Sequence, residues 1–246
     1  MKGNKMYRNI LFDLYGTLID LKTDEEKHAF WESLSLFFSY NGAQYTCDEL
    51  KTKYLELVAH RLAENIGTRY PDTKIILVLQ ALYAEKGVKA SDELLDHTTK
   101  LFRAASTEYI RLYPGVRELL DALRENKKNL YILSNGQREF SAPELRHLGI
   151  YDSFKALYSS AEIGVCKPDK QFFDFLLKKE GLNPKECLFV GNDSQTDILG
   201  ANAAGMDSVY IHSNQSRNVT ETTATYEIWD GDVSKVLSYA LAEPAG

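Results

Sequence analysis

Two short runs of apolar residues constrain the fold of this chain more than any other feature. They read ILFDL at residues 10–14 and CLFVGN at residues 187–192. Each run is continuous rather than alternating, which is typical of strands that are covered on both faces of a parallel sheet. Weaker runs at 130–133, 156–158, 208–211 and 226–229 predict further strands.

Helical patterns separate these strands in the second half of the chain. Residues 116–123 carry apolar side chains at positions i, i+3, i+4 and i+7, and residues 172–177 line a second helix that ends at Gly181. Alternation of strand and helix from about residue 113 onward is typical of βαβ units. The fold class is therefore predicted to be α/β, with a Rossmann-like, doubly wound parallel sheet.

The segment from about residue 21 to residue 110 differs, because it reads as helices only. It contains four apolar helix faces, the last of which runs from Leu95 to Leu112. We therefore expect two domains, an α/β core of residues 1–20 and 111–246 and an all-helical cap of residues 21–110 inserted after the first strand. Such an insertion could close over the carboxyl edge of the sheet.

Composition excludes some classes of partner. The 246 residues carry 29 Lys and Arg against 35 Asp and Glu, a net charge of −6, so the basic excess of a nucleic-acid-binding surface is missing. There is no apolar run near 18 residues and no apolar signal region, so we expect no membrane partner. Three scattered cysteines suit a reducing compartment, and we expect a cytoplasmic protein with a small-molecule substrate.

Polar residues follow three of the predicted strands directly. In an open α/β sheet, ligands bind beyond the carboxyl ends of the strands, so these residues are expected to converge. A fourth polar spot, Lys167-Pro168-Asp169, precedes a predicted helix. The strand-end residues are Asp13 after the first strand, Ser134-Asn135-Gly136 after the run at 130–133, and Asn192, Asp193 and Asp197 after the run at 187–191.

Together these side chains suit the chemistry of phosphoryl transfer. Asp13, Asp193 and Asp197 would repel one another without a cation, and magnesium prefers carboxylate, carbonyl and water oxygens. Lys167 adds a compact positive charge, and the glycine at position 16 lets the backbone approach a ligand closely. With the hydroxyls of Thr17 and Ser134 and the amide of Asn135, the set suits transfer of a phosphoryl group to an aspartate, followed by hydrolysis.

Four motifs resemble the signatures of the haloacid dehalogenase superfamily of hydrolases, in their order and spacing. They are DLYGTL at 13–18, LSNG at 133–136, KPD at 167–169 and VGNDSQTDILGANAAGM at 190–206. The resemblance covers nearly the whole chain, including the helical cap after the first motif. It implies hydrolysis of a small phosphate ester with magnesium.

The resemblance also implies a role for each residue of the motifs. Asp13 is similar to the covalent nucleophile, and the backbone carbonyl of Tyr15 to a magnesium ligand beside Asp13 and Asp193. Asp197 would be an outer support or a further ligand. Lys167 would neutralise charge on the nucleophile. The transferring group would be held by Thr17 and Ser134, with Gly16, Asn135 and Gly136 as further substrate-binding residues.

Tyr15 stands where phosphatases of this superfamily carry a second aspartate, which protonates the leaving group. Tyrosine has an ordinary pKa of about 10, so it is a poor acid and base near neutral pH. The DxYGT form resembles 2-haloacid dehalogenases, which need no metal, whereas Asp193 and Asp197 suit a magnesium site. The sequence favours a magnesium-dependent phosphohydrolase. The alternatives are a metal-independent 2-haloacid dehalogenase and a catalytically weak member of the superfamily that only binds a ligand.

Overall fold

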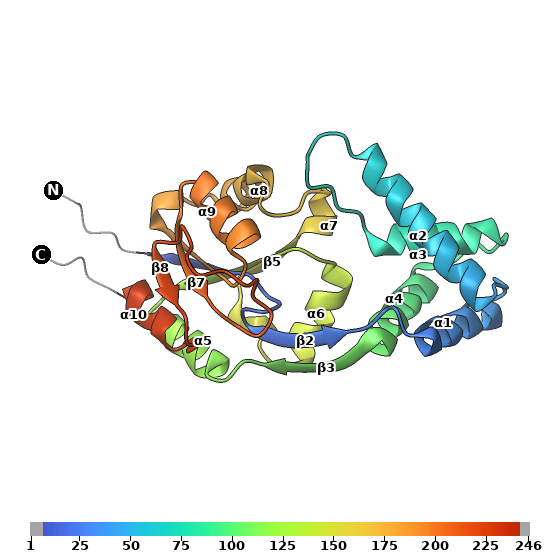
Figure 1. Cartoon of the computed structure of the whole chain (residues 1–246), viewed down its shortest axis with the longest axis horizontal. Helices are drawn as coiled ribbons and strands as arrows, with labels where there is room; N and C mark the ends of the chain where they lie inside the picture. The colour runs from blue at the N-terminus through green and yellow to red at the C-terminus, as the bar shows by residue number, and fades with distance from the viewer. Residues whose placement is uncertain (1–6, 242–246) are drawn as a thin grey trace, which may run out of the picture.

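The computed structural model describes residues 7–241, and Figure 1 shows a sheet flanked by helices beside a separate group of helices. The main sheet has six strands in the order β5-β4-β1-β6-β7-β8, and all its pairs are parallel. The predicted α/β class and doubly wound sheet are confirmed. The strands are β1 (Asn9–Phe12), β4 (Asn129–Ser134), β5 (Ala156–Ser159), β6 (Cys187–Gly191), β7 (Asp207–Ile211) and β8 (Tyr226–Ile228).

Both faces of this sheet are covered, as the continuous apolar runs predict. Along β1, Ile10 and Phe12 join a buried cluster with helices on one face, whereas Leu11 joins the cluster on the other. Residues of α5 and α10 pack in the first cluster, and residues of α8 and α9 in the second. The helices of this part are α5 (Val116–Glu125), α6 (Arg138–His147), α7 (Ser160–Ile163), α8 (Lys170–Glu180), α9 (Leu199–Ala203) and α10 (Lys235–Leu241).

The strand register brings the polar strand ends to one level. Phe12 of β1 lies opposite Ile132 of β4 and Val190 of β6. Asp13, the residue after β1, therefore lies level with the carboxyl ends of β4 and β6, which end at Ser134 and Gly191. This alignment produces the convergence that was expected from the sequence.

Four helices form the inserted cap, and they have a buried cluster of their own that extends from Phe30 to Phe102 and includes Phe140 of α6. A capping box begins α2, because Thr46 and Glu49 satisfy each other's backbone N–H groups. The cap helices are α1 (His28–Tyr40), α2 (Cys47–Glu64), α3 (Ile75–Glu85) and α4 (Asp92–Ser106). No helix within residues 7–241 is long and apolar enough to span a membrane.

The prediction of helices alone between residues 21 and 110 is wrong at both ends. Strand β2 (Ile19–Thr23) pairs antiparallel with β3 (Thr107–Leu112), and α4 ends at Ser106 instead of continuing to Leu112. The two strands pair with each other across more than 80 residues of the chain, which a local pattern does not reveal. The β2–β3 pair carries the chain into the cap and back (Figure 1). The domain boundaries at residues 20 and 110 stay a prediction.

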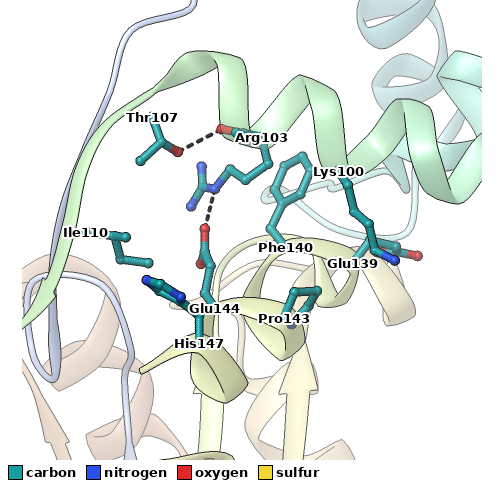
Figure 2. Close-up of a pocket in the computed structure, with 10 residues that line it drawn as sticks. Lys100, Arg103, Thr107, Ile110, Glu139, Phe140, Pro143, Glu144 and His147 are labelled. Carbon is teal, nitrogen blue, oxygen red and sulfur yellow. Dashed lines mark hydrogen bonds and ion pairs between the residues drawn. The ribbon is translucent and has the colours of Figure 1, made fainter. Parts of the chain in front are cut away.

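The cap also contacts the sheet layer directly, through α4 and α6. Arg103 of α4 donates from Nε to Glu144 Oε1 of α6 at 2.6 Å, and its guanidinium lies 4.9 Å from the ring centroid of Phe140 (Figure 2). A cavity of about 380 Å³ lies between these two helices and β3. Figure 2 shows the residues that line it.

Candidate active site

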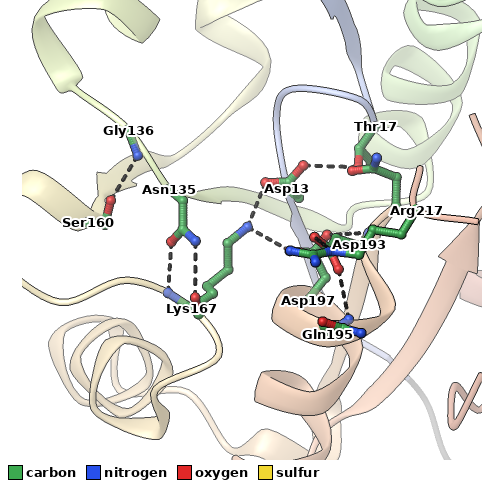
Figure 3. Close-up of polar contacts among 11 residues, drawn as sticks. Asp13, Thr17, Asn135, Gly136, Ser160, Lys167, Asp193, Gln195, Asp197 and Arg217 are labelled. Carbon is green, nitrogen blue, oxygen red and sulfur yellow. Dashed lines mark hydrogen bonds and ion pairs between the residues drawn. The ribbon is translucent and has the colours of Figure 1, made fainter. Parts of the chain in front are cut away.

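Asp13 and Lys167, which are 154 residues apart in the chain, meet at the carboxyl edge of the sheet (Figure 3). The Nζ atom of Lys167 lies 2.6 Å from Asp13 Oδ1 and 2.7 Å from Asp197 Oδ1. One ammonium group therefore bridges two carboxylates. All three side chains are buried: that of Lys167 is 1% exposed, that of Asp13 10% and that of Asp197 2%.

Burial and charge oppose each other in this bridge. Burial lowers the pKa of Lys167, but the carboxylates of Asp13 and Asp197 more than compensate, so its pKa is raised and the ammonium stays charged. Burial raises the pKa of Asp197 to about 7, although Lys167 lowers it in part. The Lys167 ammonium is thus held by two buried acids, Asp13 and Asp197.

Thr17 holds the other oxygen of Asp13. Its Oγ1 atom donates to Asp13 Oδ2 at 3.1 Å and lies 3.3 Å from Asn192 Oδ1. Gly16 permits this approach, since its φ is +85° and a Cβ atom there would lie 2.4 Å from Asn192 Nδ2. Both oxygens of Asp13 are therefore oriented by neighbouring side chains.

Ser134 presents a hydroxyl without a partner beside this centre. Within residues 7–241, its Oγ is the only fully buried side-chain nitrogen or oxygen that makes no hydrogen bond. Asn135 turns its amide toward the backbone of Lys167, accepting from its N–H at 2.7 Å and donating to its carbonyl at 3.1 Å. The Gly136 N–H donates to Ser160 Oγ at 2.8 Å. Unpaired buried polar atoms are rare, and this one is free to bind a ligand.

Asp193 lies next to this centre but bonds to a different cation. Arg217 Nε donates to its Oδ2 atom at 2.9 Å, and its Oδ1 atom accepts from the Gln195 N–H at 2.8 Å. The Asp193 N–H donates to Asp197 Oδ2 at 3.0 Å, which joins the two acids through the backbone (Figure 3). Arg217 thus neutralises one of the carboxylates that the sequence assigns to magnesium.

The predicted metal ligands do not form a compact three-residue cluster. Within the described residues, the only His, Cys, Asp or Glu group with all ligand atoms within 4.8 Å of one another is His28, Cys47 and Asp48, at the cap surface. The donor set at Asp13 is nevertheless of the right kind. It consists of carboxylate oxygens, which Mg²⁺ prefers, and two of them, in Asp13 and Asp197, already share a cation. The chemistry of these residues therefore fits a divalent ion.

Tyr15 directs its hydroxyl toward Glu144 of α6. The hydroxyl donates to Glu144 Oε2 at 2.6 Å, while Arg103 bonds to the other oxygen of the same carboxylate. Burial, followed by the negative charge of Glu144, raises the pKa of Tyr15 well above its ordinary value, although Arg103 lowers it in part. Tyr15 therefore stays protonated near neutral pH.

The sequence did not reveal three of the residues that complete the site. Arg103 and Glu144 fix Tyr15, and Arg217 binds Asp193. Asn192 was expected among the strand-end residues, and the structure adds its contact with Thr17, which lies 175 residues away in the chain. The other three gave no signal, because their partners belong to distant segments.

A family model for haloacid dehalogenase-like hydrolases matches residues 7–205 of the chain. One relative is a phosphoglycolate phosphatase of Pseudomonas fluorescens, 29% identical over 229 residues, which are 91% of this chain and 76% of that protein.

Two solved structures share the fold. The 2-haloacid dehalogenase of Pseudomonas syringae pv. Tomato has a TM-score of 0.67 and 21% identity over 96% of this chain and all of the other. A magnesium-bound HAD-hydrolase YfnB of Bacillus subtilis has a TM-score of 0.57 and 23% identity over 96% and 99% of the two chains. At these identities the structures establish the fold alone. The family match, which covers most of the chain, shows that this protein belongs to the haloacid dehalogenase-like hydrolases.

Proposed function

We propose that this hydrolase is a magnesium-dependent phosphohydrolase that cleaves a small phosphate ester through a phospho-aspartate at Asp13. The observation that carries the proposal is the buried ammonium of Lys167, which lies 2.6 Å from Asp13 and is held there by Asp197. A cation at this point neutralises an anionic group that approaches the nucleophile. The relative named phosphoglycolate phosphatase supports the choice of a phosphate ester as substrate.

The positions of these side chains support a reaction in two steps. A carboxylate oxygen of Asp13 attacks phosphorus, so an O–P bond forms to Asp13 while the bond between phosphorus and the alcohol oxygen breaks. The unpaired hydroxyl of Ser134 and the ammonium of Lys167 stabilise the oxygens of the transferring group. Water then attacks phosphorus, releases phosphate and restores the carboxylate.

Magnesium would be held by Asp13, the backbone carbonyl of Tyr15 and Asp193, with Asp197 as outer support or a further ligand. When bound, it would supply positive charge to the phosphoryl oxygens. Because the Tyr15 hydroxyl donates to Glu144, the departing alkoxide takes its proton from water. Esters with acidic alcohols should therefore react fastest.

The same tyrosine favours a second candidate, a 2-haloacid dehalogenase in which Asp13 displaces halide from carbon. A halide leaves without a proton, so a tyrosine committed to Glu144 would not impede that reaction. Lys167 would then neutralise the carboxylate of the substrate in place of a phosphoryl group.

A panel of phosphate esters and 2-haloacids, each with magnesium or with a chelator, separates the candidates. We expect phosphate release from p-nitrophenyl phosphate that requires magnesium and is lost in Asp13→Asn, but not in the exposed control Asp121→Asn. Halide release that persists in chelator would instead establish the dehalogenase. Binding of phosphate esters without release of either product would leave only a ligand-binding role.

A further inference from the structure

A cavity of about 220 Å³ lies between the cap helices and the loop that follows β4. Gln137 joins its two sides, since it donates from Nε2 to the Thr73 carbonyl and accepts from the Ile75 N–H, both at 2.9 Å. The cavity therefore has one wall in the cap and one in the sheet layer. Its lining residues include Glu25, Tyr54, Asp72, Phe102, Gln137 and Phe140.

This cavity is connected to the residues around Asp13. Gln137 is two positions beyond Asn135, whose side chain holds the backbone of Lys167. Asp72 accepts from the Ser160 hydroxyl, and the same hydroxyl oxygen accepts from the Gly136 N–H. Two hydrogen bonds through Ser160 therefore link Asp72, in the cavity wall, to the backbone of Gly136 in the motif that contains Ser134.

Two polar groups in the cavity have no partner. The Glu25 carboxylate and the Tyr54 hydroxyl make no hydrogen bond or ion pair within residues 7–241. Both side chains are half-buried. Burial raises the pKa of the Glu25 carboxyl, although the positive charge of Arg103 offsets part of the rise. Burial also raises the pKa of the Tyr54 hydroxyl, and the negative charge of Glu25 raises it further. Both residues line the same cavity.

Aromatic rings form a flat, apolar part of the remaining wall. The rings of Phe102 and Phe140 are stacked, with centroids 6.1 Å apart and planes 10° apart, and the Tyr54 ring lies 5.3 Å from that of Phe102. Ligand sites typically combine such apolar walls with a few polar groups that fix orientation. The volume is below the roughly 300 Å³ of a drug-sized site, so it suits a single ring.

We propose that this cavity receives the leaving group of the substrate and selects a flat ring that carries N–H or O–H donors. Glu25 accepts from such a donor, and Tyr54 donates to an acceptor on the same ring. This inference rests on the proposed function, because it assigns the alcohol side of the ester. An ionised carboxylate is an acceptor only, so a ring without donors leaves Glu25 unpaired. Sites with unpaired polar groups discriminate strongly against such analogues.

Three substrates test the selection: uridine 5′-monophosphate, a flat ring with a donor; p-nitrophenyl phosphate, flat without one; and glucose 6-phosphate, which is not flat. We expect wild-type kcat/KM to be at least tenfold higher for uridine 5′-monophosphate than for glucose 6-phosphate. Glu25→Met should raise KM for uridine 5′-monophosphate at least tenfold and leave KM for p-nitrophenyl phosphate within twofold. Glu25→Gln, which keeps an acceptor, should restore part of the loss.

Matched controls are Glu26→Gln, whose carboxylate pairs with Lys51 at the surface, and Tyr40→Phe, which is 79% exposed. Tyr54→Phe should raise KM for uridine 5′-monophosphate but not for p-nitrophenyl phosphate. Equal losses with both substrates in Glu25→Met, or no loss with either, would overturn the proposal. A preference for glucose 6-phosphate would do the same.

Failure of the proposed function is visible separately, as the absence of phosphate release from p-nitrophenyl phosphate by the wild type. In that event, calorimetric binding of uridine 5′-monophosphate to Asp13→Asn and to Asp13→Asn/Glu25→Met still tests the cavity. Weaker binding to the double variant supports the proposal. Equal binding, or no binding to either, refutes it.

Discussion

The hydroxyl of Tyr15 donates to Glu144 Oε2 at 2.6 Å, and this contact determines what Tyr15 can do. Arg103 of the cap holds the other carboxylate oxygen, and its guanidinium lies 5.3 Å from the centroid of the Tyr15 ring. The side chain that stands in place of a second acid is thereby fixed in a cap-to-core contact. It keeps its proton, because burial and the charge of Glu144 raise its pKa.

Tyr15→Asp should raise phosphatase activity. A carboxyl group at this position is too short to reach Glu144 in the same way and can exchange a proton with the leaving group, and general acid–base assistance is typically worth about 10²–10⁴-fold. We expect kcat for an alkyl phosphate to rise at least tenfold, measured as phosphate release. Tyr15→Phe, the matched control, removes the hydroxyl without supplying an acid and should give no rise. A fall in Tyr15→Asp, with an unchanged circular dichroism spectrum, would contradict this account.

The pair of Arg103 and Glu144 should stabilise the folded protein measurably. Their side chains are only 15% and 10% exposed, and removing one partner of a buried pair typically costs about 3–5 kcal/mol. In urea unfolding, Arg103→Met and Glu144→Gln should each lower the free energy of unfolding by about that amount, and the double variant by less than the sum.

The exposed pair of Lys100 and Asp96, in the same helix as Arg103, provides the control. Its side chains are 55% and 54% exposed, so breaking it should cost less than about 1 kcal/mol. Strict additivity of the two Arg103 and Glu144 substitutions would show that the pair contributes nothing of its own.

Ser134→Ala should separate activity from stability. The Ser134 hydroxyl has no partner within the described residues, so removing it deletes an unsatisfied group, which typically costs about 1–3 kcal/mol when buried. We expect an unchanged or higher free energy of unfolding, together with a loss of at least tenfold in kcat/KM for p-nitrophenyl phosphate. Ser141→Ala is the control, because its hydroxyl donates to the Gln137 carbonyl at 3.0 Å. Equal activity in wild type and Ser134→Ala would argue against a role in binding the phosphoryl group.

Much of the fold could be predicted because the sheet strands carry their own signal. The runs around Ile10 and Leu188 are apolar on both faces, and the structure buries both faces. The meeting of Asp13, Lys167 and Asp197 was also predictable, since the first and last follow neighbouring parallel strands. The pairing of β2 with β3 was not predictable, because the two strands are more than 80 residues apart in the chain.

The contacts across the cap interface could not be predicted from the sequence either. Which face of α4 meets α6 depends on how the whole cap packs, so nothing near Tyr15 indicated Arg103 or Glu144. The loop that contains Arg217 has no apolar periodicity, and its contact with Asp193 spans 24 residues. These residues became visible only in three dimensions.

Asp20 should make stability depend on pH in the acid range. Burial raises its pKa, but hydrogen bonds from Asn214, Arg111, Gln215 and Tyr109 outweigh burial, so the pKa is lowered in the folded state. Such a group contributes stability above its unfolded pKa of about 3.9, and the contribution is lost as pH falls through the lower folded value.

Asp20→Asn should therefore lower the free energy of unfolding at pH 7 by about 1–3 kcal/mol, because donors at a 5% exposed carboxylate lose a charged acceptor. The difference from wild type should shrink below about pH 4, in urea unfolding series at several pH values. Asp121→Asn, at a 68% exposed carboxylate, should show no such trend. A difference that is constant over the whole series would show that the charge of Asp20 is not responsible.

Arg217→Gln should increase the affinity of the site for a divalent cation. Arg217 occupies Asp193 Oδ2 at 2.9 Å, so a cation that takes this oxygen must displace the guanidinium. The two side chains are 54% and 23% exposed, and such pairs are worth up to about 1 kcal/mol, so we expect the Kd for Mn²⁺ to fall by about three- to fivefold. Electron paramagnetic resonance of free Mn²⁺ measures this Kd without turnover.

The control is Arg124→Gln, at an exposed position, which should leave the Kd for Mn²⁺ unchanged. Equal or weaker binding in Arg217→Gln would show that Arg217 does not compete for Asp193, and a wild type and variant that both fail to bind Mn²⁺ would contradict the proposed magnesium site.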